Sequence, residues 1–533
     1  MKDVLHRQSY LVVPEGVFWF ESLGYLALTG RTICVDTTAQ RGHITYGDPM
    51  ARENFSTSVL LCSAILVGVL AIAQDPSQMI WSNMSVIPDE DGILSVQQKP
   101  FDRNGFVIAR DMHVNKFNDQ KRGLKNMSEC FFNWGDCATS DKQDFELCEQ
   151  LGLSVLVAPP EAKRGRHILP DEWMKMTDEE IDALVKRMVE QGGNSKAIVG
   201  YQIADEPSAR AFPKLAVAVA AVRKYAPGKL THINLYPNYA TLWTMDQVKS
   251  QLGTKTYQEY LEQFVEIVKP DFICYDNYMV QFSMDQQNRK LMAKHYTNIM
   301  AVRDVAMKNN LPWWNVVSSN QIRQHTVIPT LDNMMLQAYT SLAAGAGGVR
   351  WYTYWQSGYD YAPINENEQR TNTWYALREV NRHLAILGPM IKTLKSMGVY
   401  FTDPAIDPSL PLLPGKIVQE AMCTEPLMIG EFESDRGNRY AMVVNISLEH
   451  SASFVLKTDI ENERLFIVST GEQFPYFREI VSAESRRAVQ VNNVDQVARS
   501  KEKAYWLPAG QGVLIKCSGM VDEKGTVCDC KTP

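Results

Sequence analysis

Short apolar runs alternate with amphipathic segments along the middle of the chain. The runs predict eight strands: Phe106–Ala109, Cys130–Trp134, Leu153–Ala158, Ala197–Ala204, Leu230–Leu235, Asp271–Tyr278, Pro312–Ser318 and Gly348–Trp355. Apolar residues spaced three and four apart predict helices after most of them. The predicted helices are Asp141–Leu151, Asp178–Gln191, Phe212–Tyr225, Tyr257–Val268, Arg289–Asn309 and Leu331–Ala344.

Eight strand–helix repeats within roughly 250 residues are typical of a (β/α)8 barrel, which belongs to the α/β fold class. An open doubly wound sheet is the alternative. It is disfavoured because no Gly-x-Gly-x-x-Gly follows a strand, and because polar and aromatic residues gather at the C-terminal ends of the strands. We therefore expect a catalytic barrel over residues 100–395, closed by a helix at Trp374–Thr393.

The pattern changes after the barrel. From about Lys416 onward it consists of short alternating strands such as Ala441–Val444 and Gly512–Ile515. A series of short strands predicts a small β-sandwich, here over residues 400–518. The polar residues 519–533 are expected to form a tail.

The longest apolar run, Val59–Ala73, indicates export. It is too short for a membrane span, follows Met50 and Arg52, and ends in an Ala-x-Ala pattern, as secretory signal peptides do. We expect a signal peptide at 50–73, an over-extended start at 1–49, and a periplasmic or extracellular mature chain without a stable membrane span. A true N-terminal region followed by a membrane anchor is the alternative.

Composition and charge narrow the function. The chain of 533 residues is 45% hydrophobic and 22% charged, which excludes a wholly disordered, collagenous or coiled-coil protein. The net charge of −7 leaves no basic surplus for phosphates, so no nucleic-acid partner is expected. The nine histidines form no metal-binding pair, and no cofactor motif is present; the sequence therefore predicts neither a metal nor a cofactor.

Two adjacent carboxylates, Asp205 and Glu206, end the fourth predicted strand and precede Pro207. Acids before a proline suit the first turn of a helix, which is the structural interpretation. At the C-terminal end of a barrel strand, however, a carboxylate pair points to catalysis. A glycosidase needs two such groups, one to protonate the leaving oxygen and one to attack the sugar or activate water.

The segment Ile203–Pro207 resembles the strand-four Asn-Glu-Pro signature of the clan A glycoside hydrolases. Asn234–Asn238, Asp271–Tyr278 and Tyr352–Trp355 are similar to secreted bacterial glycosidases with this barrel, over about residues 120–400. The resemblance implies an exported hydrolase that cleaves O-glycosidic bonds of an oligo- or polysaccharide. It also implies that Glu206 is the general acid/base, and burial and the Asp205 charge would both help Glu206 keep its proton.

Two departures from that family leave the second carboxylate open. Asp205 replaces the usual Asn, and strand seven, Trp313–Gln321, has no acid where clan A members place a nucleophilic Glu. Asp276 on strand six is one candidate for the base or nucleophile. Alternatively, Asp205 orients a substrate acetamido group that itself attacks, as in substrate-assisted N-acetylhexosaminidases. A catalytically degenerate carbohydrate-binding barrel is the third interpretation.

Aromatic and amide side chains at the predicted strand ends supply a sugar subsite, because sugar rings present apolar faces to aromatic rings and hydroxyls to amides. The candidate substrate-binding residues are Asn133, Trp134, Asn234, Tyr236, Tyr275, Asn277, Tyr278, Gln321, Trp351, Tyr354 and Trp355.

Overall fold

The computed structural model describes residues 105–111, 123–138, 142–159, 167–241, 251–356, 358–460, 464–468 and 504–518, together with short strands in the first hundred residues. The predicted signal peptide at 50–73 and the tail at 519–533 lie outside the described residues. Within residues 1–49, β1 (Ser9–Val13) pairs with β2 (Gly16–Phe20), and β3 (Tyr25–Leu28) pairs with β4 (Arg31–Cys34). The over-extended start therefore stays a prediction.

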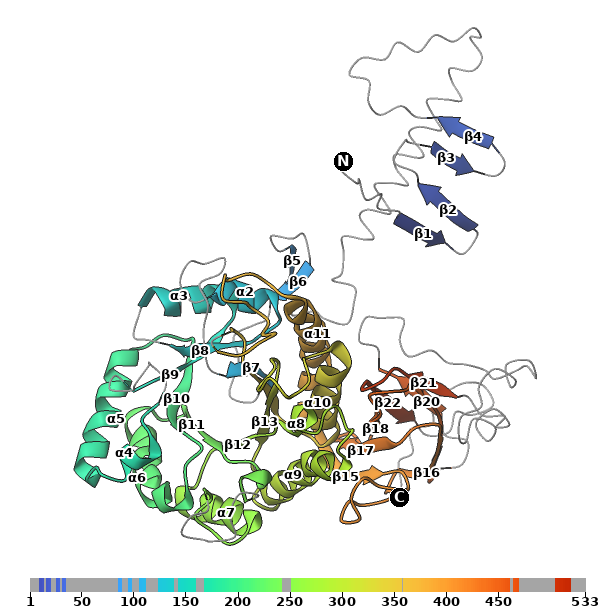
Figure 1. The fold of residues 1–533 in the computed structure, drawn as a ribbon. Coiled ribbons are helices and arrows are strands. Elements are labelled where there is room, and N and C mark those ends of the chain that lie inside the picture. Colours follow the sequence, from blue (N-terminus) through green and yellow to red (C-terminus); the bar gives the residue numbers. More distant parts are fainter. Residues whose placement is uncertain are drawn as a thin grey trace, which may run out of the picture. The chain divides into compact units, whose positions relative to one another are not determined.

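The predicted barrel is confirmed. Eight parallel strands close in sequence order: β7 (Val107–Asp111), β8 (Trp134–Ala138), β9 (Ser154–Val157), β10 (Ile198–Asp205), β11 (Leu230–Leu235), β12 (Ile273–Asp276), β13 (Trp313–Ser318) and β14 (Gly348–Tyr352). The last strand returns to the first, since Gly348 pairs with Val107 and Tyr352 with Asp111. Figure 1 shows the helices around the outside of this ring.

The described helices are α2 (Leu124–Glu129), α3 (Lys142–Leu151), α4 (Pro170–Trp173), α5 (Asp178–Gly192), α6 (Phe212–Tyr225), α7 (Tyr257–Gln263), α8 (Met279–Phe282), α9 (Arg289–Lys308), α10 (Leu331–Ala343) and α11 (Asn372–Lys392). Seven of these described helices match the predicted segments, whereas the short helices α2, α4 and α8 were not predicted. Two 3-10 helices, η2 (Ala209–Ala211) and η3 (Asn238–Thr241), accompany them, and the π-helix η4 (Phe264–Val268) continues α7. Threonines begin three of the helices: Thr177, Thr256 and Thr330 each accept a backbone N–H and complete a capping box.

The second strand was predicted four residues too early. Cys130–Asn133 is the turn between α2 and β8, and Phe131 has a left-handed backbone with φ 61°. Phe131 and Phe132 are both buried by distant parts of the chain: Arg378 of α11 lies over the Phe131 ring, and Phe132 packs edge-on against Tyr354 beyond β14. An apolar run alone does not separate a buried turn from a strand.

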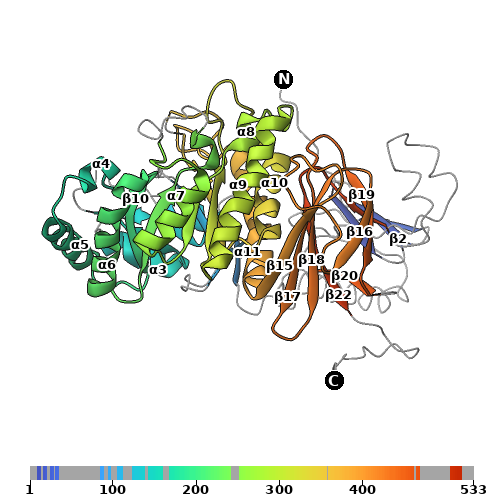
Figure 2. The ribbon, with the colours of Figure 1, turned by 90° about the horizontal axis from the view of Figure 1, so that it is seen from below.

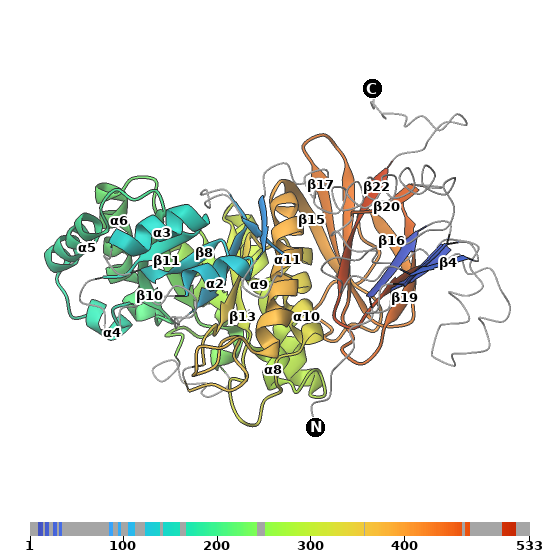
Figure 3. The same ribbon diagram turned by 90° about the horizontal axis from the view of Figure 1, so that it is seen from above.

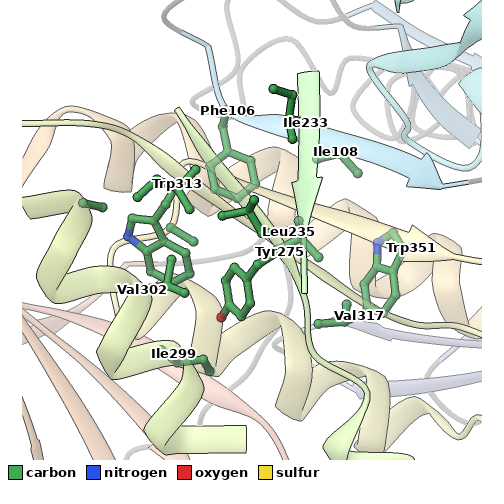
Figure 4. Packing of buried hydrophobic residues seen from close by; sticks show 14 of the residues in the cluster. Phe106, Ile108, Ile233, Leu235, Tyr275, Ile299, Val302, Trp313, Val317 and Trp351 are labelled. Carbon is green, nitrogen blue, oxygen red and sulfur yellow. The ribbon is translucent and has the colours of Figure 1, made fainter. Parts of the chain in front are cut away.

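Alternation along the strands divides the core into two layers. Inward side chains of the barrel form one cluster, namely Val107, Ala109, Trp134, Leu156, Leu230, Phe272, Cys274, Trp314 and Val316. Outward side chains join the main core beneath the helices. Figure 4 shows Tyr275 and Trp313 there, with Ile299 and Val302 of α9. Residue parity along a strand therefore decides which side chains line the barrel.

Two antiparallel sheets follow the barrel. One holds β15 (Leu394–Phe401), β17 (Leu427–Ser434), β18 (Arg439–Asn445), β22 (Gly512–Ser518) and β20 (Arg464–Ile467), and the other holds β16 (Val418–Cys423), β19 (Ala452–Thr458) and β21 (Tyr505–Leu507). Residues of both sheets share one buried apolar cluster. The strands predicted from the alternating pattern are present, whereas a sandwich packing of the sheets stays a prediction. A further pair, β5 (Ser85–Pro88) and β6 (Leu94–Gln97), precedes the barrel.

The larger sheet lies against the barrel helix α10, as Figures 2 and 3 show from opposite sides. Gly430 of β17 faces Ala343 of α10 so closely that a Cβ atom on Gly430 would lie 1.9 Å from the Ala343 carbonyl oxygen. Only glycine permits this approach. The contact fixes the face of α10 opposite the barrel, and so supports the barrel from outside.

Candidate active site at the barrel mouth

Three polar side chains at the C-terminal ends of adjacent strands form one hydrogen-bonded group. The Asn234 Nδ2 of β11 donates to Asp205 Oδ1 of β10 at 3.1 Å and to Asp276 Oδ1 of β12 at 2.8 Å. Asn234 and Asp276 are buried, whereas Asp205 is partly exposed. The C-terminal face is where barrel enzymes place their catalytic residues. We call these three residues the carboxylate–amide group.

The register of the strands produces this arrangement. Asp205 pairs with Asn234, so both side chains point into the barrel, and Asp276 lies two residues beyond Cys274, the partner of Asn234. Each of the two carboxylate oxygens is within hydrogen-bond distance of the same amide nitrogen. These two carboxylate oxygens, of Asp205 and Asp276, therefore lie within about 6 Å of each other.

Glu206 follows directly in a strained backbone. A bulge in β10 between Gln202 and Ala204 precedes it, and its φ is 45°, in the left-handed region that side chains with a Cβ rarely adopt. The following proline restricts the backbone of Glu206 further. Its N–H donates to the Asn234 carbonyl at 2.8 Å, and Tyr260 Oη donates to the Pro207 carbonyl at 2.7 Å.

Strain of this kind is sustained only where the surroundings fix the backbone, and it clusters at functional sites. Here the fixed backbone holds a partly exposed carboxyl group at the mouth, beside the carboxylate–amide group. The helix-cap interpretation of Asp205 and Glu206 fails, because η2 begins at Ala209 and its preceding residue, Ser208, makes no side-chain cap.

Tyrosines surround the acids. Burial, followed by the charge of Glu206, raises the pKa of Tyr236 to about 12. Burial, with the charges of Asp276 and Glu206, raises the pKa of Tyr239 well above its usual value. Tyr278 Oη donates to Asp276 Oδ1 at 2.9 Å, and the Tyr278 N–H donates to Tyr239 Oη at 3.3 Å. The hydroxyls of Tyr236 and Tyr239 therefore stay protonated near neutral pH. The charges of Glu206 and Asp276 both contribute to the raised pKa of Tyr239.

Several predicted site residues lie at this mouth. Asn234, Tyr236 and Tyr278 adjoin the three predicted catalytic acids. Gln321 and Trp355 lie on the loops after β13 and β14, where Gln321 Nε2 donates to the Thr326 carbonyl at 2.6 Å and Trp355 Nε1 to the Asn365 carbonyl at 3.0 Å.

Four predicted substrate residues lie on the outer face of the barrel instead. Tyr275 and Asn277 point toward α9, where Asn277 Nδ2 donates to the His295 carbonyl at 3.1 Å. Trp351 and Tyr354 point toward α11, where Trp351 Nε1 donates to Asn381 at 2.7 Å and Tyr354 accepts from Trp374 at 3.1 Å. The sequence analysis placed all four in the site because they lie near a strand end. Strand parity turns Tyr275, Asn277 and Trp351 outward, whereas Tyr354 lies beyond the end of β14 and its hydroxyl faces Trp374.

Asn133 and Trp134 also lie away from the mouth, because the second strand starts later than predicted. Asn133 joins the first two strands at their N-terminal ends: its Nδ2 donates to the Phe106 carbonyl at 2.6 Å, and its Oδ1 accepts the Ile108 N–H at 2.8 Å. Trp134 is buried inside the barrel, edge-on to Trp314 with ring centroids 4.9 Å apart. Both residues therefore stabilise the barrel and do not line the candidate active site.

The structure adds tyrosines that the sequence analysis missed. Tyr239 adjoins both Glu206 and Asp276, as described. The Tyr352 ring packs against Tyr278 at 5.4 Å and against Tyr359 at 5.3 Å, and the Tyr352 and Tyr359 hydroxyls are hydrogen-bonded. Parity along β14 was the available signal for Tyr352, since it lies two residues beyond inward-facing Arg350. Tyr239 lies in the one-turn helix η3 and Tyr359 in a loop, and no periodicity marks either residue.

No carboxylate ends β13: the following residues, Ser319 and Asn320, bond instead to Thr353. Over the described ranges, no three His, Cys, Asp or Glu side chains are grouped as a metal site would require. In the same part of the chain, no helix combines the length and apolarity needed to cross a membrane.

Comparison with known proteins gives only distant likenesses. No protein-family model and no curated protein sequence matches the chain. Among solved structures, a cold-adapted β-galactosidase from Rahnella sp. R3 is similar with a TM-score of 0.42 and 12% identity, over 55% of this chain and 57% of that one. A β-glucuronidase from Ruminococcus gnavus has a TM-score of 0.36 and 10% identity, over 56% and 52% of the two chains.

A further glycosidase, a β-galactosidase from the psychrophilic Marinomonas ef1, gives a TM-score of 0.36 and 11% identity, over 48% of this chain and 54% of that one. The chain thus spans little more than half the length of these enzymes. Likeness at this level assigns no activity, so the residues at the barrel mouth have to carry the functional argument.

Proposed function

We propose that this protein is an exported glycoside hydrolase that cleaves O-glycosidic bonds of an oligo- or polysaccharide. The observation that supports it is the position of Glu206, fixed in a strained backbone beside the carboxylate–amide group at the C-terminal ends of adjacent barrel strands. Glu206 thus provides a proton donor, and the carboxylate–amide group a second carboxylate, at one end of the barrel. Glycoside hydrolysis requires these two groups. The strand-four resemblance to clan A assigns the donor role to the same residue.

In the proposed reaction, Glu206 protonates the glycosidic oxygen as the bond to the anomeric carbon breaks. Asp276 either attacks that carbon or takes a proton from the attacking water. Asp276 suits this role because it is buried, ionisable and oriented by two donors, Asn234 Nδ2 and Tyr278 Oη. The role does not require a carboxylate on strand seven.

Asp205 receives a positioning role in this scheme. Its hydrogen bond to Asn234 orients the amide toward Asp276. We therefore prefer Asp276 as the second carboxylate to a substrate-assisted reaction oriented by Asp205. A degenerate barrel that only binds carbohydrate remains an outcome of the test.

The test measures the release of reducing sugar from a panel of glycans by the purified protein and by Glu206→Gln. General acid catalysis contributes about 10²–10⁴-fold, so the variant should lose at least 100-fold in turnover. Glu179→Gln, an exposed change in the first turn of α5, is the matched control and should retain activity. Release of no sugar from any glycan by the parent protein, together with glycan binding, would establish the binding barrel instead.

A further inference from the structure

A cavity lies beside the barrel mouth, between the loops that follow β13 and β14 and the start of α11. Its volume is about 750 Å³, within the range of small-ligand sites. Polar and apolar atoms contribute about equally to its surface, and each lining residue carries an amide, hydroxyl or carboxyl group. The lining consists of Gln321, Gln324, Gln356, Asp360, Tyr361, Thr371, Asn372 and Thr373. We call it the loop cavity.

A row of tyrosines connects the candidate active site to the loop cavity. Tyr278, which donates to Asp276, packs against Tyr352, and Tyr352 packs against Tyr359. Tyr359 immediately precedes Asp360 and Tyr361 of the cavity lining. All three ring-packed tyrosines are partly exposed. The tyrosine row therefore runs from Asp276 to the residue that precedes the cavity lining.

The walls of the cavity are held by the protein itself. The Gln321 N–H donates to the Asp360 carbonyl at 2.8 Å and joins the two loops. At the end of the second loop, the buried Arg370 side chain forms an ion pair with Glu129 and donates to Asn126 at 3.1 Å. A site whose walls are ordered before binding loses less entropy when a ligand enters.

Tyr361 stands out at this cavity. Its side chain is 54% exposed, although large apolar surfaces are usually covered, and its backbone has φ 53° in the left-handed region. A bulky residue in that conformation marks a position worth a functional explanation. An exposed ring beside amides and hydroxyls matches a saccharide, whose ring has apolar faces and whose hydroxyls are both donors and acceptors.

We infer that the loop cavity is a distal subsite for a neutral saccharide unit, reached by an oligosaccharide that extends from Asp276 along the tyrosine row. This inference rests on the proposed function, which places the reacting end of the substrate at Asp276. It adds the substrate class, a neutral oligosaccharide of several units. Neutral sugar is specified because none of the described residues lining the cavity is cationic, while Asp360 would repel an acidic sugar.

Calorimetric titration of the Glu206→Gln protein tests the inference without turnover, so inactivity of the parent enzyme would count against the proposed function alone. The probes are β-linked neutral gluco-, galacto- and xylo-oligosaccharides of two to six units. For at least one series, affinity should rise at least 10-fold from the disaccharide to the hexasaccharide. Adding Tyr361→Ala should abolish that gain, whereas adding Tyr375→Ala, an exposed tyrosine of α11, should preserve it.

Three results would overturn the distal subsite. They are affinity independent of chain length, an equal gain with and without the Tyr361 ring, and no binding of any probe. Tighter binding of an oligogalacturonide than of every neutral probe would overturn the neutral class.

Discussion

The amide of Asn234 should control the ionisation behaviour of the candidate active site, and Asn234→Leu removes it with little change in volume. The side chain is 2% exposed, and its one Nδ2 group serves both Asp205 and Asp276. A hydrogen bond to a charged group contributes about 1.5–3 kcal/mol. Since about 1.4 kcal/mol corresponds to tenfold in rate, loss of the bond to Asp276 should lower kcat/KM by about 10- to 100-fold.

The same change should alter the pH profile. A carboxylate that loses a donor holds its proton more tightly, so the acidic limb of kcat/KM should move up by about one to two pH units. The assay is kcat/KM from pH 3 to 9 on a glycoside that the parent enzyme cleaves. Tyr278 Oη still donates to Asp276 in the variant, which keeps the group from complete loss of orientation.

Asn315→Leu is the matched control. Asn315 is also a buried strand asparagine, but it faces outward and donates to Ser341 Oγ of α10 at 2.9 Å. Both variants should lose some stability, and only Asn234→Leu should shift the acidic limb. An Asn234→Leu profile that coincides with the Asn315→Leu profile in shape and height would refute the role assigned to the amide.

Three further predictions concern stability and processing. Burial raises the pKa of Asp285 to about 6, so its contribution to stability is full below pH 3.8 and is lost as pH rises through about 6. In thermal unfolding, Asp285→Asn should therefore stabilise the protein at pH 7 by about 1–2 kcal/mol after solvent screening and have no effect at pH 3.5. Asp435→Asn is the exposed control. A destabilised Asp285→Asn at pH 7 would contradict this. The buried Glu431 carboxylate accepts the N–H groups of residues 416–418 at 2.7–2.9 Å, so Glu431→Ala should lose about 3–5 kcal/mol in urea unfolding, and a loss below 1 kcal/mol would reject the reasoning. Exported protein should begin near Gln74 by N-terminal sequencing, and a start at Met1 would reject the signal peptide.

The barrel was predictable because its sequence signal is local and repeated. Each strand is a short apolar run, and each helix carries its apolar residues at spacings of three and four, as in α5 with Ile181, Leu184, Val185 and Met188 buried. The prediction of the second strand failed because Phe131 and Phe132 are apolar for a tertiary reason. Phe131 lies beneath Arg378 of α11 and Phe132 packs against Tyr354, both more than 200 residues further along the chain. No local pattern contains that contact.

The candidate site was predictable where chemistry and strand parity agree. Asp276 and Tyr278 lie two apart and both reach the mouth, whereas Tyr275 and Asn277, the two residues on either side of Asp276, face α9. Parity was visible in the sequence but has to be anchored to one residue known to point inward, and that anchor came only with the register of the strands. The link from Asn234 to two carboxylates on different strands depends on the same register.

The central claim, that Glu206 is the proton donor of a glycosidase, is tested most directly by the dependence of kcat on the leaving group. The measurement compares the parent protein and Glu206→Gln on a series of aryl glycosides whose phenols differ in acidity, together with one alkyl glycoside. Loss of the donor should cut turnover of the alkyl glycoside at least 100-fold and that of the most acidic phenol much less, because a good leaving group departs without protonation. Asp276→Asn should damage all substrates alike. An equal loss across the series in Glu206→Gln, or unchanged activity, would contradict the assignment.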